Sequence, residues 1–126
     1  VMTQPYLNRV DDEGEKVLIF LGGAFSHAVT RGPILGPNGT YTDITIGWKN
    51  VHRLDADEAA VAVARHALAM TPGGPEQLLY ARVDLVGNET GEPCVLEVEL
   101  TEPCLFLEHG AATNRLADLI ARLARD

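Results

Sequence analysis

Apolar and polar residues follow one another along the chain with two periods, which predict strands and helices in turn. An uninterrupted apolar run, Val17–Leu21, is typical of a buried strand, and Gly22-Gly23 is a hairpin turn sequence. The segment Ala24–Thr30 then predicts the return strand. Strict alternation along that strand would place three side chains on one face: Phe25, His27 and Val29.

Two later segments carry apolar residues at helical spacing. Asp55 and Glu58 match a capping box, and Thr71–Pro75 ends the helix that they begin. Its predicted buried face consists of Val61, Ala64, Ala67 and Leu68. A second stripe near the end of the chain predicts a final helix through Leu116, Leu119, Ile120 and Leu123.

Two further strands are predicted between these helices, Leu78–Val86 and Cys94–Leu100, with a turn region from Gly87 to Pro93. The order of strands, helix, strands and helix predicts an α+β fold, with a mainly antiparallel sheet packed by two helices. The chain is interpreted as one domain, residues 1–126, with a flexible loop over 32–50 that is rich in Gly-Pro and Asn-Gly turn pairs. Within that loop, residues 40–46 are compatible with a short strand.

Composition restricts the partners of this domain. Its 126 residues contain 10 basic and 18 acidic side chains, a formal net charge of −8, which argues against a general nucleic-acid binder and against binding to anionic membranes. The longest stretch without charged side chains, Val17–Thr30, is shorter than the roughly 20 apolar residues of a membrane-spanning helix. The two cysteines, Cys94 and Cys104, are predicted to be free, and a reducing cytoplasmic setting is expected.

Four charged residues carry the clearest chemical signal. The strand period places Arg82 and Asp84 on one face of their strand, and Glu97 and Glu99 on one face of the next. A hairpin centred near Thr90-Gly91 would set Asp84 opposite Glu97, and Arg82 opposite Glu99. Carboxylates crowded in this way repel one another, so a hard divalent cation such as Mg²⁺ would stabilise them, and the arginine suits a phosphate. The pattern therefore suggests phosphoryl-transfer chemistry.

A purely structural interpretation explains the same four residues. Alternating apolar and charged positions are what any half-exposed strand shows, with Arg82 bridging Asp84 and Glu99 on a solvated outer face. His27 is likewise more often a hydrogen-bonded sheet residue than a catalytic one. The pattern alone leaves both interpretations open.

Several short motifs in order resemble one known family. They are Gln4-Pro5-Tyr6-Leu7, Gly14–Phe20, Gly22–Val29, Arg82-x-Asp84, Glu97-x-Glu99 and Glu102–Leu107. Together they resemble the ATP-grasp superfamily of ATP-dependent carboxylate–amine ligases, in particular its glutathione-synthetase-like bacterial branch. Most of the superfamily has asparagine where this chain has Glu99.

The resemblance implies a role for each matched residue. Asp84, Glu97 and Glu99 match Mg²⁺ ligands that hold the phosphates of ATP, and Arg82 matches the arginine that faces the transferred phosphate. Gln4, Pro5, Tyr6 and Leu7 match the hinge strand, within segment 1–8, that binds adenine through its backbone. Glu15, with Glu13 as a substitute, matches the acid that binds the ribose hydroxyls, and Arg31 matches a basic residue near the phosphates or the acceptor. Where the branch has a basic residue in the 32–48 loop, the resemblance suggests Lys49 as its replacement.

The implied reaction joins a small carboxylate to an amine or similar nucleophile through an acyl phosphate. The family's substrate domain and lid lysine would precede Val1, so the chain is expected to be the C-terminal portion of a longer ligase, inactive in ligation by itself. Two alternatives remain: a non-catalytic nucleotide-binding or regulatory module derived from this fold, and a plain interaction domain that forms a homodimer through a sheet edge. The residues do not specify which carboxylate and nucleophile are joined.

Overall fold

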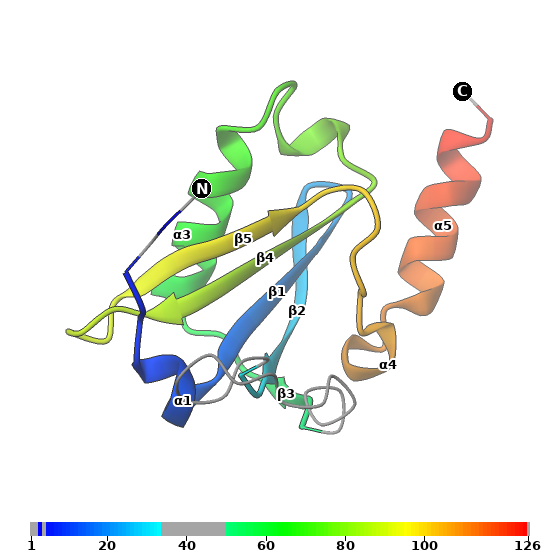
Figure 1. Cartoon of the computed structure of the whole chain (residues 1–126). Coiled ribbons are helices and arrows are strands. Elements are labelled where there is room, and N and C mark those ends of the chain that lie inside the picture. The colour runs from blue at the N-terminus through cyan, green and yellow to red at the C-terminus, as the bar shows by residue number, and fades with distance from the viewer. Residues whose placement is uncertain (1–2, 4, 34–49, 126) are drawn as a thin grey trace.

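The apolar run that begins at Val17 lies on the central strand of an antiparallel sheet (Figure 1). The computed structural model describes residues 3, 5–33 and 50–125. Within these residues the sheet has five strands in the order β3-β2-β1-β4-β5. The elements are α1 (Arg9–Glu13), β1 (Glu15–Leu21), β2 (Ala24–Arg31), β3 (His52–Leu54), α3 (Glu58–Ala69), a 3₁₀ turn (Pro75–Gln77), β4 (Tyr80–Gly87), β5 (Pro93–Glu99), α4 (Leu107–Gly110) and α5 (Thr113–Leu123). The predicted α+β class and antiparallel sheet are confirmed.

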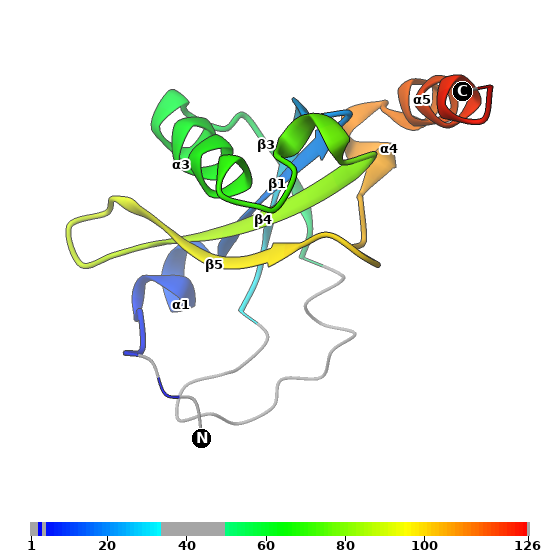
Figure 2. The ribbon, with the colours of Figure 1, turned by 90° about the horizontal axis from the view of Figure 1, so that it is seen from above.

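Helix α3 covers one face of the sheet (Figure 2). Its small side chains allow close packing, and the buried residues of this layer are Leu18, Phe20, Ala28, Ala60, Ala64, Leu68, Ala81, Val83 and Leu85. The helix begins at Glu58, where the Asp57 carboxylate accepts a hydrogen bond from the Ala60 amide at 2.7 Å. The predicted cap, Asp55, was wrong because that side chain is fully exposed and lies two residues before the cap position.

The opposite face is divided into an apolar part and a charged part. The apolar part lies on β1 and β2 and packs against the segment that follows β5, with Val17, Ile19, Leu21, Val29, Phe106 and Ala112 buried. Of the predicted α5 stripe, Leu116 and Leu119 pack against this layer, whereas Ile120 and Leu123 are exposed. Figure 1 shows why, since α5 extends away from the sheet.

Two β-bulges set which side chains share a face. The β1–β2 register shifts between Ile19 and Phe20, so that Ile19 pairs with His27 but Phe20 pairs with Phe25. Phe25 therefore packs against Phe20 in the α3 layer, with ring centroids 5.7 Å apart, and does not share the face of Val29. The predicted common face of Phe25, His27 and Val29 was wrong because one extra residue reverses the alternation.

The second bulge lies between β4 and β5, where the register shifts between Asp84 and Leu85. The extra residue is Leu96, which is exposed instead of joining Val98 in the core. The tight turns are as predicted: Gly22 and Gly23 both have positive φ, which a two-residue hairpin of type I′ requires. The β4–β5 hairpin turns through Asn88–Glu92, as predicted for Gly87–Pro93.

The start of the chain differs from the prediction. Residues 3 and 5–8 form no strand, which corrects the predicted hinge strand for that part of segment 1–8, because Pro5 has no amide hydrogen for a ladder and Asn8 already leads into α1. The acidic residues Asp11, Asp12 and Glu13 lie in helix α1. Gln4, Trp48, Lys49 and the short strand suggested for 40–46 lie outside the described residues.

Two features of composition have structural counterparts. Cys94 and Cys104 are both free, as predicted. No helix among the described residues is long and apolar enough to cross a membrane.

Candidate functional site

A buried ion pair lies at the centre of the charged part of the sheet. Arg82 and Asp84 are two residues apart on β4, so their side chains emerge from the same face. Arg82 Nε donates to Asp84 Oδ1 at 2.9 Å, and Nη2 donates to Oδ2 at 2.9 Å. The side chains are only 5% and 1% exposed, which is unusual for charged groups and requires that each be fully paired.

Glu97 and Glu99 of β5 complete the predicted constellation. The register sets Asp84 opposite Glu97 and Arg82 opposite Glu99, as the sequence predicted. Arg82 Nη1 lies 2.9 Å from Glu99 Oε2, and Nη2 lies 3.5 Å from Glu97 Oε2. The predicted bridge from Asp84 through Arg82 to Glu99 is therefore present. The solvated face that accompanied this interpretation was wrong for Arg82 and Asp84, although Glu97 is half exposed.

A second arginine joins the cluster from the other side. Arg31 at the end of β2 pairs in register with Glu15 at the start of β1, and its Nε and Nη2 both donate to Glu15 Oε2. The same Nη2 lies 3.3 Å from Asp84 Oδ2. The contact between Arg31 and Asp84 was not predicted, because it requires β1 to lie between β2 and β4. We call these six residues the charged cluster: Glu15, Arg31, Arg82, Asp84, Glu97 and Glu99.

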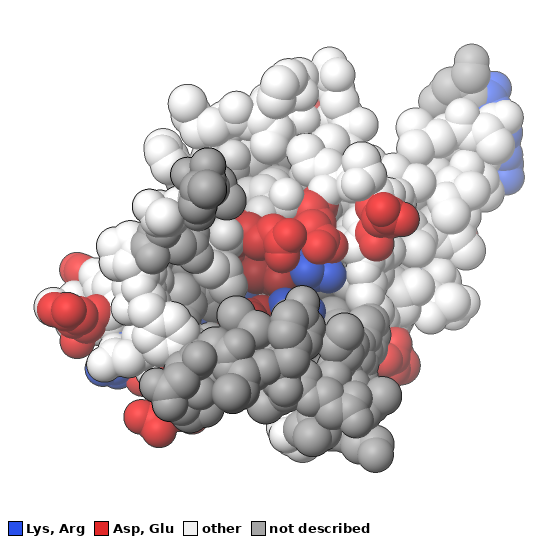
Figure 3. All heavy atoms as spheres, viewed as in Figure 1, with Lys and Arg blue, Asp and Glu red and all other residues white. Residues whose placement is uncertain are grey.

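The charged cluster carries an excess of negative charge, since its four carboxylates outnumber its two guanidinium groups. Figure 3 shows acidic and basic side chains gathered at the centre of this face. Burial raises the pKa of Glu97, and the negative charges of Glu99 and Asp84 raise it further, against the opposing effect of Arg82. The ionised form of Glu97 is therefore less favourable in the free chain than it would be in water.

The donor set suits a hard cation on its exposed side. Carboxylate oxygens are the ligands that Mg²⁺ prefers, and Glu97 and Glu99 are the two members of the charged cluster that reach solvent. Asp84 is different, because its two oxygens already accept hydrogen bonds from Arg82 and Arg31. No three His, Cys, Asp or Glu side chains in the described parts of the chain are grouped as a ready metal site. Arg82 contacts all three predicted ligands, and the metal assignment stays a prediction.

The predicted adenine and ribose residues are only partly placed. Pro5 and Tyr6 are exposed, and the Tyr6 hydroxyl donates to Asp11 at 2.5 Å. Glu15 is buried within the charged cluster, whereas its suggested substitute, Glu13, pairs with Arg9 at 2.5 Å. The structure therefore favours Glu15 over Glu13 as a member of any site on this face.

Comparison with known proteins shows what this chain is similar to. No protein-family model matches the chain. The chain is 42% identical over 115 residues to the cycloserine biosynthesis protein DcsG of Streptomyces lavendulae, covering 88% of this chain and 38% of DcsG. The crystal structure of the D-cycloserine synthetase DcsG superposes with a TM-score of 0.83 at 39% identity, over 94% of this chain and 41% of that one. The chain is homologous to part of an ATP-grasp ligase.

A more distant structure supports the ATP-grasp fold alone. D-Alanine–D-alanine ligase from Bacillus anthracis, solved in complex with ATP, matches with a TM-score of 0.52 at 17% identity, over 86% of this chain and 36% of that one. The chain thus spans about two-fifths of the length of the relatives that it matches.

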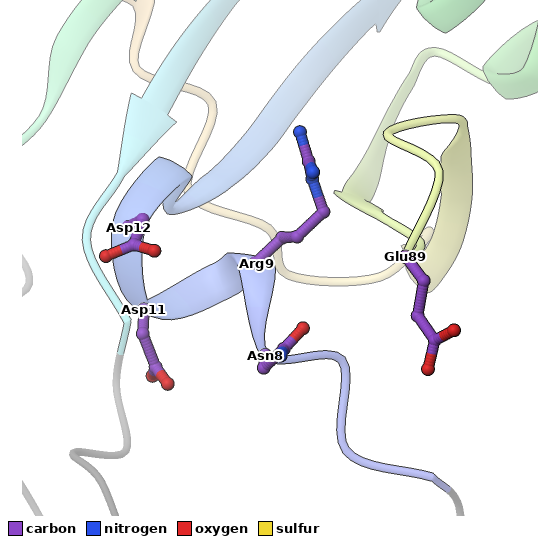
Figure 4. Close-up of a pocket in the computed structure, with 5 residues that line it drawn as sticks. All are labelled: Asn8, Arg9, Asp11, Asp12 and Glu89. Carbon is purple, nitrogen blue, oxygen red and sulfur yellow. The ribbon is translucent and has the colours of Figure 1, made fainter.

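A surface pocket of this chain is separate from the charged cluster. Its volume is about 540 Å³, and it lies between α1 and the β4–β5 turn, lined by Asn8, Arg9, Asp11, Asp12 and Glu89 (Figure 4). Arg9 Nε is buried without a hydrogen-bond partner among the described residues, although the rest of the guanidinium pairs with Glu13. None of the residues predicted for the site lines this pocket, so the pocket gives no support to the predicted site.

His27 has a structural role in this chain. Its ring is buried, with Nε2 2.9 Å from the carbonyl oxygen of Leu105 and 3.0 Å from that of Phe106. Carbonyl oxygens only accept, so Nε2 carries the proton and Nδ1 accepts from the Ser26 hydroxyl at 3.0 Å. These bonds hold Phe106, whose φ of 47° is left-handed, against β2. The interpretation of His27 as a hydrogen-bonded sheet residue is supported.

Lowering the pH should reduce the contribution of His27 to the stability of the fold. Burial lowers the pKa of His27 below its ordinary value, with the two carbonyl contacts opposing the shift. Below about pH 6.5 the unfolded chain binds a proton that the folded chain does not, so the stability contributed at this site falls as the pH decreases. Urea unfolding between pH 5 and 7.5 should show this loss in the wild type. This loss of stability should be reduced in His27→Gln and retained in His66→Gln, since His66 is exposed. An equal dependence of the unfolding free energy on pH in all three proteins would contradict the role assigned to His27.

Proposed function

We propose that this chain forms the Mg²⁺- and ATP-binding part of a ligase that activates a small carboxylate as an acyl phosphate and transfers it to an amine or similar nucleophile. The observation that carries the proposal is the charged cluster, in which buried arginines lie beside carboxylates in excess on one face of the sheet. Homology to an ATP-grasp ligase supports the reaction class. The relative's name supports a cycloserine synthetase-like activity as the most specific form of the proposal.

Four residues of the charged cluster would bind the cation and the phosphates in this proposal. Glu97 and Glu99 would hold the cation on the exposed side of the charged cluster, with Asp84 behind them. Arg82 Nη1 lies 2.9 Å from Glu99 Oε2, and Glu99 is partly exposed, so this nitrogen is the donor best placed to turn toward a phosphate. When bound, Mg²⁺ and ATP supply the neutralising charge and the phosphoryl group.

The remaining residues would bind the nucleoside end. Glu15 would accept hydrogen bonds from the ribose hydroxyls, and the backbone of Gln4–Leu7 would bind adenine. None of these roles requires a side chain that forms a covalent intermediate, because positioning and charge stabilisation are the main contributions to phosphoryl transfer. The substrates of the whole ligase are small molecules under this proposal.

Cation binding tests the proposal directly. Mn²⁺, a paramagnetic substitute for Mg²⁺, should bind the 126-residue chain in an electron paramagnetic resonance titration. Glu97→Gln and Glu99→Gln should each weaken Mn²⁺ binding at least about tenfold, a loss of about 1.4 kcal/mol, because each removes a carboxylate ligand. Glu102→Gln is the matched control, since Glu102 is exposed and outside the charged cluster, and it should leave the affinity unchanged.

The same variants separate a binding role from a structural one. Because the pKa of Glu97 is raised, folding favours its neutral form, and a neutral side chain at this position should stabilise the cation-free chain near pH 7. Glu97→Gln should therefore increase the free energy of unfolding, by about 0.5 kcal/mol, while it weakens Mn²⁺ binding. A variant that lost stability and kept its Mn²⁺ affinity would support the non-catalytic, structural interpretation instead.

Nucleotide binding completes the test. Calorimetric titration of Mg²⁺–ATP should detect binding to the wild type and weaker binding to both glutamine variants. Unchanged ATP binding by Glu97→Gln and Glu99→Gln would contradict the proposed site.

A further inference from the structure

Arg31 differs from the other arginine of the charged cluster in what it joins. One guanidinium links side chains from three adjacent strands, since Arg31 lies on β2, Glu15 on β1 and Asp84 on β4. Its Nε lies 3.1 Å from Glu15 Oε2, and its Nη2 contacts both Glu15 Oε2 and Asp84 Oδ2, the latter at 3.3 Å. Under the proposed function, Glu15 would bind the ribose of ATP, and Asp84 would lie near the cation at its phosphates.

The two carboxylates depend on Arg31 unequally. Asp84 also receives two hydrogen bonds from Arg82. Glu15 contacts no cation other than Arg31 among the described residues. Because the Glu15 side chain is only 7% exposed, its charge would be buried without compensation if Arg31 were removed.

The contacts also leave part of Glu15 available. Both hydrogen bonds from Arg31 end on Oε2, and no hydrogen bond to Oε1 is found among the described residues. A carboxylate held through one oxygen presents the other in a fixed direction, which suits recognition of a hydroxyl pair. The guanidinium itself is mostly buried, at 13% exposure, and its Nε and Nη2 donate to the two carboxylates.

We propose that Arg31 is a positioning residue that holds Glu15 and Asp84 in place, and that it does not contact the phosphates. The inference rests on the proposed function, and it replaces the role near the phosphates that the family resemblance implies for Arg31. Arg31 acts through Glu15, so its removal weakens binding of the nucleoside whether or not phosphates are attached. A phosphate-binding arginine would instead matter more as phosphates are added.

A series of ligands with different numbers of phosphates tests this role. Dissociation constants of the 126-residue chain for adenosine, ADP and ATP would be measured by NMR chemical-shift titration, with Mg²⁺ present throughout. Arg31→Gln should weaken all three ligands by the same factor, about tenfold, as expected when a partner that orients a binding group is lost. The control is Arg53→Gln, because Arg53 is 70% exposed and only loosely paired with Asp55, and it should change none of the three.

A double-mutant comparison locates the effect at Glu15. If Arg31 acts through Glu15, the losses of Arg31→Gln and Glu15→Gln for adenosine should not add in the double variant. Arg31→Lys keeps the charge but not the planar fork, so it should show a smaller loss that is again equal for the three ligands. Should Arg31→Gln fail to fold, this lysine variant carries the same comparison.

Different outcomes would overturn different statements. An unchanged adenosine affinity in Arg31→Gln or Arg31→Lys, with a loss that grows from ADP to ATP, would make Arg31 a phosphate contact and leave the proposed function intact. A wild-type chain that binds none of the three ligands would overturn the proposed function, and the role of Arg31 with it.

Discussion

Replacing Asp84 by asparagine should destabilise the chain by about 3 kcal/mol, since removal of one partner from a buried ion pair leaves the other charge uncompensated. Both oxygens of the Asp84 carboxylate accept hydrogen bonds from arginine, Oδ1 from Arg82 and Oδ2 from Arg82 and Arg31. Either orientation of an asparagine amide would therefore direct its NH₂ group at a guanidinium donor. Urea unfolding followed by circular dichroism measures the change.

The matched control is Asp55→Asn, because the Asp55 side chain is fully exposed. It should change the free energy of unfolding by less than about 0.5 kcal/mol. If Asp84→Asn were as stable as this control, the arginine contacts of Asp84 would contribute nothing to the fold, and the charged cluster could not be regarded as a preorganised site.

Replacing Gly110 by alanine should destabilise the chain by about 2 kcal/mol. A Cβ atom at Gly110 would lie 2.2 Å from Cγ and 2.3 Å from Nδ1 of His27, far inside contact distance. In a helix, alanine is intrinsically better than glycine by up to about 1 kcal/mol, but displacing the buried ring also breaks its bonds to Leu105 and Phe106. The clash should therefore outweigh the gain in helix propensity.

A double variant separates the clash from other effects. With the ring removed in His27→Ala, the two closest contacts disappear, and the His27 Cβ, at 2.8 Å, is left of the three nearest atoms. Adding Gly110→Ala to that background should cost less than it does in the wild type, with the remaining cost due to the short contact with the Cβ of residue 27. Gly32→Ala is the matched control, since the nearest side-chain atom among the described residues would lie at an ordinary 3.7 Å. An equal cost of Gly110→Ala in both backgrounds would show that the contact with His27 is not responsible.

The structural roles of Asp84 and Gly110 differ in how well the sequence predicts them. The importance of Asp84 follows from a local pattern, because the strand period and a hairpin register place it among Arg82, Glu97 and Glu99. The contact between Gly110 and His27 joins residues that are distant in the chain, and no local pattern indicates it. The resemblance to ATP-grasp ligases was visible in the order of short motifs, and homology to DcsG supports it.

The sequence by itself determined the longer elements and the chemistry available to them, but not α1, β3 or α4. Alternating positions predicted the strands that carry the site, the i, i+3, i+4 stripes predicted α3 and α5, and the hairpin register predicted which charges of β4 and β5 face each other. These features are local, since they depend on side-chain periods within one element or across one turn.

The tertiary structure alone decided how Arg31 joins the site. Without the bulge near Ser26, the Gly22-Gly23 hairpin would pair Glu15 with Thr30, and Arg31 would lie on the opposite face. The bulge pairs Glu15 with Arg31, and the position of β1 between β2 and β4 brings Asp84 within reach of the same guanidinium. A β-bulge moves every side chain beyond it to the opposite face of the sheet. Whether a bulge forms depends on how both faces of the sheet pack, which no local pattern shows. That is why the sequence supplied the charges, and the assembled sheet decided that Arg31 pairs with Glu15 and Asp84.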